Sequence, residues 1–212
     1  MNKKIQKLTV SGVMIALAVS LSFVKVFALP YGGSITAFSM VPIMLVGFIY
    51  GIPWGLLTGA VYGVIEGVLG ATVTAAFADQ DVKGVLIICL LDYIVAFSVL
   101  GLSSIFKKGI KNAPVAFGLG TLTSGLLRYL CHFISGYLVF GQWAEWFFTQ
   151  KSVTFGQKIL EKYSGKGLAA IYSLIYNGTY MIPEIILSVI LAVILMNIPQ
   201  VKRIAYSGNL NK

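Results

Sequence analysis

The sequence is poor in charge, above all in negative charge. Only 11% of its 212 residues are Asp, Glu, Lys or Arg, with seven acidic residues against 16 basic ones. Hydrophobic residues reach 58% and the mean hydropathy is +0.88. These values lie far outside those of a soluble globular domain of this length. They indicate an integral membrane protein.

The sequence also lacks the residues on which several kinds of enzyme depend. It has no Gly-x-x-x-x-Gly-Lys-Ser/Thr phosphate-binding loop, so we do not expect the chain itself to hydrolyse ATP through such a loop. Its single histidine, His132, cannot form a histidine-rich metal site, and no nucleophile–base set stands out. Cys89 and Cys131 lie in apolar segments, where free thiols pack as small hydrophobic groups. We therefore expect a protein that is not an enzyme and holds no metal or cofactor.

Six apolar runs are long enough to count as membrane spans, because a helix needs roughly 20 apolar residues to cross the hydrocarbon core. Gly51 and Pro53, between the second and third runs, are also compatible with a kink in one helix. The runs are 8–29, 36–53, 55–73, 85–106, 114–140 and 168–197. We expect an all-α integral membrane protein, a bundle of six transmembrane helices in a single domain that covers 1–212.

Basic residues gather at run ends that would share one side of the membrane. They precede the first run and follow the fourth and the sixth: Lys3, Lys4, Lys7, Lys107, Lys108, Lys111, Lys202, Arg203 and Lys212. Because lysine and arginine are enriched in cytoplasmic loops, both termini are predicted to be cytoplasmic. The net charge of +9 is then explained by topology and by contact with anionic lipids of the bilayer, and not by binding to nucleic acid.

Polar and charged side chains inside the runs indicate a ligand site. Such a group at bilayer depth costs on the order of 2.5–3.5 kcal/mol unless it is paired or hydrated. On the predicted topology these groups share one level in the outer part of four helices, and Glu184 lies deeper. They are Glu66, Asp92, Tyr93, Arg128, His132, Tyr172, Tyr176 and Asn177. Structural ion pairs, for instance between Asp92 and Arg128, are the alternative for any one of them.

Helical spacing and charge describe the site further. Arg128, His132 and Gly136 recur every fourth residue, so they share a helix face on which the glycine is predicted to open room above the histidine. Three carboxylates, from Glu66, Asp92 and Glu184, outnumber the one guanidinium if His132 is neutral. This excess favours an organic cation held between carboxylates and aromatic faces.

Two stripes of small residues allow close packing of helices. Five glycines at every fourth position, 51 to 67, are predicted to pack inside the protein. The first run has a shorter stripe of Gly12, Ala16 and Ser20. That stripe either packs inside or docks another membrane subunit, and the residues alone favour internal packing.

Four separated segments, 31–36, 91–93, 127–136 and 172–178, resemble the thiamine-specific substrate-binding subunits of energy-coupling factor (ECF) transporters. The resemblance extends over essentially the whole chain. It implies a six-helix bundle in the bacterial cell membrane, with a deep thiamine pocket near the outer surface that the loop between the first two helices closes. It also implies transport with a partner membrane subunit, which contacts the small-residue stripe of the first helix, and with two ATPase subunits.

The resemblance assigns thiamine-binding roles to Asp92, Tyr93, Arg128, His132, Phe140, Tyr172 and Asn177. To these we add Gly136 and Glu66 from spacing and charge. Asp92 would pair with the thiazolium charge or accept from the aminopyrimidine, His132 and Phe140 would stack, and Tyr172 and Asn177 would form directed hydrogen bonds. Where this chain has Phe140, some family members have tryptophan, so Trp143 or Trp146 are candidates to cover the pocket instead.

Two other functions fit the same residues. One is a binding subunit of the same class for another vitamin or base. The other is a self-sufficient secondary transporter that uses Glu66, Asp92 or Glu184 for proton coupling. An internal inverted repeat would favour the second function, and the sequence has no convincing one.

Overall fold

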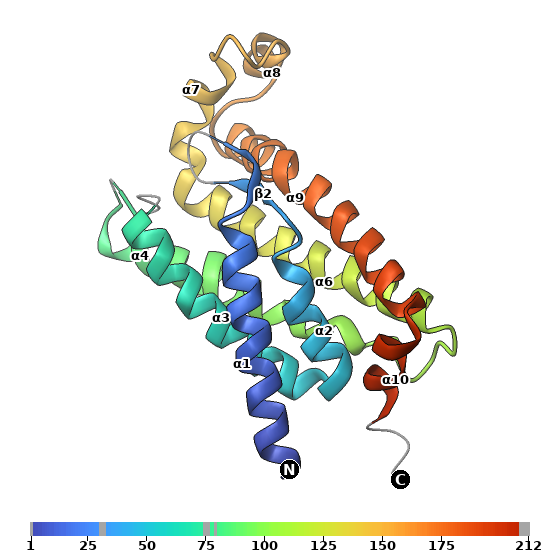
Figure 1. Ribbon diagram of the computed structural model, residues 1–212. Helices are drawn as coiled ribbons and strands as arrows, with labels where there is room; N and C mark the ends of the chain where they lie inside the picture. The colour runs from blue at the N-terminus through green and yellow to red at the C-terminus, as the bar shows by residue number, and fades with distance from the viewer. Residues whose placement is uncertain (1, 30–32, 74–76, 79, 208–212) are drawn as a thin grey trace.

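The computed structural model describes residues 2–29, 33–73, 77–78 and 80–207 (Figure 1). Residues 31, 32 and 212, which belong to segments discussed above, lie outside this part of the chain. The long helices are α1 (Lys3–Ser22), α2 (Met40–Tyr50), α3 (Ile52–Val73), α6 (Ala113–Ser135) and α9 (Gly165–Asn197). Shorter α-helices are α4 (Val82–Ile88), α5 (Ala96–Ser98), α7 (Ala144–Phe148), α8 (Gly156–Lys162) and α10 (Pro199–Ser207).

Two segments between these helices depart from α-helical geometry without leaving the helix path. The run after α4 continues as a π-helix, η1 (Cys89–Val95), then α5, then a 3₁₀-helix, η2 (Val99–Ser104). α6 continues as a second π-helix, η3 (Gly136–Phe140), followed by a 3₁₀ turn, η4 (Gly141–Trp143). π-Helical turns are rare and occur frequently at functional sites.

The first apolar run is not one helix, and the chain is not purely α-helical. α1 ends at Ser22, and the expected helix up to residue 29 is replaced by strand β1 (Lys25–Ala28), which pairs antiparallel with β2 (Ser34–Thr36). Hydropathy alone does not separate a short apolar strand from a helix. The β-branched Val24 and Val26, with Lys25 between them, were the available signal for a strand.

Gly51 separates two helices and does not merely kink one. Its φ of 91° lies in the left-handed region that glycine adopts at little cost, and the chain reverses there from α2 into α3. α2 and α3 then pack closely, since a Cβ added to Gly55 would lie 2.6 Å from the Cα of Gly47. Gly59, Gly63 and Gly67 face the segment from η1 to η2, and a Cβ at Gly63 would lie 3.0 Å from the Tyr93 carbonyl carbon. A Cβ at Gly51 would meet nothing within 4 Å. The predicted internal packing of this stripe is confirmed for Gly55, Gly59, Gly63 and Gly67, and not for Gly51.

Four helical segments of the described chain are long and apolar enough to cross a membrane, namely Lys3–Ser22, Ile52–Thr72, Val82–Ser104 and Gly165–Asn197. α2 is apolar but has only 11 residues. α6 has 23 residues, yet its buried face carries polar side chains and it is not among the four. The protein is thus a helical membrane protein, and the number of six spans stays a prediction.

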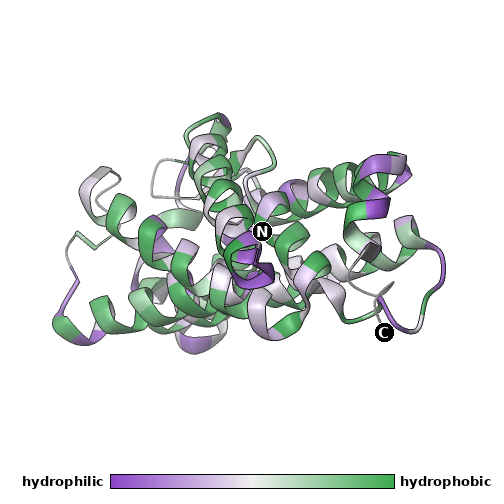
Figure 2. Cartoon of the chain, turned by 60° about the horizontal axis from the view of Figure 1, so that its bottom comes forward, coloured by the Kyte–Doolittle hydropathy of each residue, from purple (hydrophilic) through white to green (hydrophobic). Residues whose placement is uncertain are grey.

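Hydrophobic residues, green in Figure 2, occur along the long helices, and many large ones are exposed. On α9, Ile182, Ile186, Ile190 and Ile194 recur every fourth residue and are all about half exposed. Such a stripe on the outside of a bundle suits contact with lipid tails. In Figure 1 the start of α1 and α10 lie at one end of the bundle, and the β1–β2 hairpin lies toward the other, with α7 and α8.

The small-residue stripe of α1 lies on the outside of the protein. Gly12, Ala16 and Ser20 are all exposed, and a Cβ at Gly12 would meet nothing within 4 Å. The expectation of internal packing is therefore wrong for this stripe. The opposite face of α1, with Ser11 and Ala18, packs inward.

Candidate functional site

A cavity of about 680 Å³ lies between the hairpin, α3, η1, α6, η3 and α9. Every residue predicted for the site lines it: Glu66, Asp92, Tyr93, Arg128, His132, Gly136, Phe140, Tyr172 and Asn177. The geometry thus brings together side chains from elements more than 100 residues apart in sequence. Glu184, which was expected to lie deeper, lines the same cavity. Pockets of this size are typical of sites for small molecules.

Asp92 is held in place by two side chains of α6. His132 Nδ1 lies 2.7 Å from Asp92 Oδ1, and the Ser135 hydroxyl donates to Asp92 Oδ2. Among the described residues His132, and not Arg128, is paired with Asp92, so the alternative of an Asp92–Arg128 pair is wrong. The π-helical turn η1, which contains Asp92, adds one residue per hydrogen-bonded turn and so changes the direction in which this side chain points.

Arg128 is a buried cation with incomplete hydrogen bonding. It is 9% exposed, and its Nε and Nη1 have no hydrogen-bond partner among the described residues. Its guanidinium instead lies 4.3 Å from the centre of the Phe97 ring. An unsatisfied buried polar group costs about 1–3 kcal/mol, and more when it is charged. Groups of this kind suggest that a ligand or water completes the site.

Two further polar atoms of the cavity also lack a hydrogen-bond partner among the described residues. His132 Nε2 and Glu66 Oε1 are buried and have no hydrogen-bond partner in the described part of the chain. Because His132 Nδ1 faces Asp92, Nε2 is the ring nitrogen that stays available to a ligand. The three carboxylates line the cavity together with Arg128 and with Lys25 of the hairpin, so with His132 neutral the formal count is three negative charges against two positive ones, a smaller excess than the predicted three against one.

Asn177 is fixed by the protein at both ends of its amide. Its Nδ2 donates to the carbonyl oxygens of Ser173 (2.9 Å) and His132 (3.2 Å), and its Oδ1 accepts from the Tyr180 hydroxyl at 2.6 Å. A Cβ at Gly136 would lie 2.8 Å from Asn177 Nδ2. Gly136 therefore lets α9 side chains approach η3, and the expected free room above His132 is occupied.

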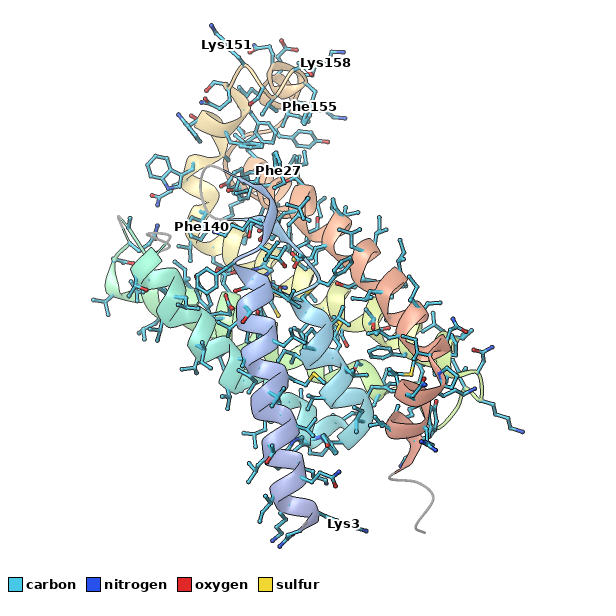
Figure 3. The ribbon with its side chains drawn as sticks, in the orientation of Figure 1. Lys3, Phe27, Phe140, Lys151, Phe155 and Lys158 are labelled. Atoms are coloured by element: carbon cyan, nitrogen blue, oxygen red, sulfur yellow. The ribbon has the colours of Figure 1, made fainter. Side chains whose placement is uncertain are left out.

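Aromatic rings form one wall of the cavity near the hairpin end. Phe147 lies 5.3 Å from Tyr172 and 5.7 Å from Tyr176 between ring centres, and Trp143 lies 6.5 Å from Trp146. Both tryptophans line the cavity and are 44% and 38% exposed, which fits the prediction that one of them covers it. Phe140, labelled in Figure 3, belongs to the same wall, and Lys3 at the start of α1 lies toward the other end of the molecule.

Sequence reasoning missed several residues that line the cavity, among them Thr36, Ser39, Tyr62, Phe97 and Tyr180. Tyr180 could have been found, since it shares a face of α9 with Asn177 and Glu184. Phe97 lies in an apolar run where nothing distinguishes it from a lipid-facing residue. Thr36 and Ser39 reach the site only because the chain forms a hairpin, which the apolar pattern did not predict.

Comparisons with known proteins agree with this architecture. The model of a family described as thiamine transporter protein (Thia_YuaJ) matches residues 8–146. The chain is 33% identical to thiamine transporter ThiT of Bacillus subtilis (strain 168) over 212 aligned residues, which cover 94% of this chain and 95% of that protein. A solved structure of ThiT from Listeria monocytogenes is similar in fold, with a TM-score of 0.69 at 20% identity, over 94% of this chain and 98% of the other. The chain belongs to the thiamine transporter family and is a transporter rather than an enzyme.

Proposed function

We propose that this protein is the thiamine-binding subunit of an ECF-type uptake transporter in the bacterial plasma membrane. It captures thiamine at the outer face and passes it inward through a complex driven by ATP. In this proposal the chain has six spans in one domain and both termini lie in the cytoplasm, so the hairpin end of the cavity faces outside. The start of α1 and α10 lie together at the end away from the hairpin, which supports this topology.

The observation that carries the proposal is the surroundings of Asp92. Its carboxylate is oriented by His132 and Ser135 in a cavity that has an excess of carboxylates and an aromatic wall. A flat organic cation gains Coulombic and cation–π attraction in such a place, and more so where water is excluded. The thiazolium ring of thiamine has this chemistry, and the names of the relatives point to the same ligand.

The outward stripe of α1 supports a partner in the membrane. Gly12, Ala16 and Ser20 present a smooth exposed surface on which a helix of another subunit can pack at close range. The chain has no phosphate-binding loop of its own, so two ATPase subunits in the complex would supply the energy.

Quenching of tryptophan fluorescence by thiamine in the purified protein tests the binding function. Trp143 and Trp146 line the cavity, whereas the indole N–H of Trp54 donates to Ser11 on α1 and Trp54 does not line it. Thiamine at micromolar concentration should quench the wild-type protein and the Trp54→Phe control. The quenching should be lost when Trp143 and Trp146 are both replaced by Phe. A folded wild-type protein that shows no binding contradicts the proposal.

Uptake by reconstituted vesicles tests the coupling. We expect thiamine uptake only when the partner membrane subunit, the ATPase subunits and ATP are present. Uptake driven by a pH gradient in vesicles that contain this chain alone would instead favour a proton-coupled secondary transporter.

A further inference from the structure

A second pocket, of about 400 Å³, lies between α10 and the loop that precedes α6. Lys111 of this loop lines it, together with Pro199, Lys202, Arg203 and Tyr206. The last four recur at intervals of three or four residues, so they share one face of α10. This pocket shares no lining residue with the large cavity, and in Figure 1 α10 lies at the end of the molecule away from α7 and α8.

Both sides of this pocket are fixed by packing and hydrogen bonds. On the loop side, Ile110 packs against the core, and Asn112 Oδ1 accepts from the backbone N–H of Val115 at 3.2 Å. On the helix side, Ala205 is buried, and its carbonyl oxygen accepts from the Lys107 ammonium at 2.8 Å. The side chains of the pocket therefore extend from a backbone that is already in place, which lowers the entropic cost of binding.

The positive charge of this pocket is not balanced by a carboxylate. Three of its five lining residues are cations, and none of the three forms an ion pair in the described part of the chain. The sequence has no Asp or Glu from 93 to 144 or after 184, the stretches that contain Lys111 and α10. The acidic residues of the described chain lie elsewhere: three line the large cavity, Asp81 caps α4, and Glu145 and Glu161 lie on α7 and α8. The pocket thus suits an anion.

A buried hydroxyl adds a directed donor to these cations. The Tyr206 ring lies edge-on to Phe48, with 5.9 Å between ring centres, and 5.2 Å from the Lys107 ammonium. Its Oη is buried and has no hydrogen-bond partner among the described residues. A phenol hydroxyl can donate to an anionic oxygen, and a guanidinium can bind two oxygens of one phosphate. Hydroxyl, guanidinium and two ammonium groups together match a phosphate.

The position of the pocket indicates a lipid as the source of the phosphate. α9, which is long and apolar enough to cross a membrane, ends at Asn197, and α10 begins at Pro199. Ile198 continues the exposed isoleucine stripe of α9 up to the pocket and is 39% exposed, and Ile204 beside Arg203 is 57% exposed. Cations therefore stand next to apolar surface at the end of a span. Basic pockets in such places bind anionic lipid headgroups.

We propose that this pocket binds the phosphate of one anionic phospholipid. Arg203 pairs with two phosphate oxygens, Lys111 and Lys202 supply further positive charge, and the Tyr206 hydroxyl donates one hydrogen bond. The bound lipid joins α10 to the loop before α6 and so stabilises this end of the bundle. The inference goes beyond the proposed function, because it requires a membrane protein but neither thiamine nor a partner subunit.

Native mass spectrometry of the full chain in an uncharged detergent measures binding of the first lipid molecule. The probes are dioleoylphosphatidylglycerol, which is anionic, and dioleoylphosphatidylcholine, which has the same acyl chains and no net charge. The wild type should bind phosphatidylglycerol at least about tenfold more tightly. The combined variant Lys111→Gln, Lys202→Gln and Arg203→Gln should bind it about a hundredfold more weakly, since each cation at a lipid surface contributes about fivefold.

A second triple variant, Lys151→Gln, Lys158→Gln and Lys166→Gln, is the matched control. It removes the same charge from exposed positions, and Figure 3 shows Lys151 and Lys158 at the opposite end of the molecule from Lys3. Its affinity for phosphatidylglycerol should stay within about twofold of the wild type. Equal losses in the two triple variants would show a general attraction of lipid to positive charge and would overturn the pocket.

Tyr206→Phe separates the directed hydroxyl from the charge. It should weaken binding of phosphatidylglycerol by about threefold to tenfold, the effect of one hydrogen bond to a charged group. The unfolding temperature without lipid should not change, because the hydroxyl has no partner to lose among the described residues. Unchanged affinity in Tyr206→Phe would overturn the assignment of this hydroxyl as a donor.

Thermal unfolding distinguishes a lipid from free phosphate. Phosphatidylglycerol should raise the unfolding temperature of the wild type and of the matched control, and not that of the Lys111, Lys202 and Arg203 variant. Millimolar inorganic phosphate should act no differently from sodium chloride at the same ionic strength. Equal stabilisation by phosphate alone, or equal binding of the two lipids by the wild type, would overturn the lipid site. A wild type that binds phosphatidylglycerol and not thiamine supports the lipid site and contradicts only the proposed function.

Discussion

Two cations in different parts of the bundle, the half-buried Lys107 and the buried Arg128, have different surroundings. Lys107, near α10, donates its ammonium to the carbonyl oxygens of Phe48 (2.5 Å) and Ala205 (2.8 Å), and it lies over the rings of Phe48 and Tyr206. Arg128, in the cavity, has two nitrogens without a partner among the described residues. The protein satisfies the first cation itself and leaves the second incomplete.

The difference separates a structural charge from a functional one. Burial lowers the pKa of Lys107 to about 8, and the carbonyl oxygens act against that shift because they favour the charged form. Lys107 thus joins the end of α2 to α10. Arg128 gains no comparable compensation, and groups of this kind at membrane depth are retained for binding or transport.

The largest expected effect is at Asp92. Asp92→Asn should weaken thiamine binding on the order of a hundredfold, because it removes the charge opposite the cation. Isothermal titration calorimetry measures the change in dissociation constant. Ser135→Ala is the comparison variant. It keeps the charge of Asp92 and removes one of the two side chains that bond to its carboxylate, so its loss of thiamine affinity should be smaller. Equal losses of thiamine affinity in both variants would show that the orientation of Asp92 matters and its charge does not.

Arg128→Met should reduce thiamine affinity by about tenfold and leave the free energy of unfolding within about 1 kcal/mol of the wild type. Removing a buried cation whose Nε and Nη1 have no partner among the described residues relieves a desolvation cost, which offsets the lost packing on Phe97. Calorimetry and thermal unfolding in detergent report the two quantities separately. A large loss of stability with unchanged affinity would make Arg128 structural, like Lys107.

Lys107→Met is the converse variant. It should lower the free energy of unfolding by about 1–3 kcal/mol, because it leaves buried carbonyl oxygens of α2 and α10 without a donor. Thiamine affinity should stay within twofold of the wild type. Reduced affinity in a protein of wild-type stability would show that the two ends of the bundle are coupled.

The smallest expected effect on binding is at the outer face of α1. Gly12→Leu should leave the thiamine dissociation constant unchanged, since a Cβ added there would meet nothing within 4 Å and the position lies outside the cavity. Copurification with the partner membrane subunit should be lost, because the added bulk prevents close helix packing. Val13→Ala, at an exposed neighbouring position, is the control. Intact assembly of Gly12→Leu would place the partner on another face.

The sequence predicted the residues around the cavity better than the backbone that holds them. Polar and charged residues are costly at bilayer depth and are easily recognised within apolar runs, so Asp92, Arg128 and His132 could be predicted to share one site. Which of them pair could not be predicted, because a π-helical turn at Asp92 sets the direction of that side chain. The hairpin was missed for a related reason: residues 24–29 are as apolar as a helix end, and only pairing with β2 makes them a strand.

The preference of the wild-type protein for a cation tests the central claim most directly. Dissociation constants are measured for thiamine and for a neutral analogue of the same shape that lacks the positive charge of the thiazolium ring, in the wild type and in Asp92→Asn. We predict that the wild type prefers thiamine by at least about tenfold and that Asp92→Asn removes the preference. Equal affinities for the two ligands in the wild type, or an undiminished preference in Asp92→Asn, would contradict the account.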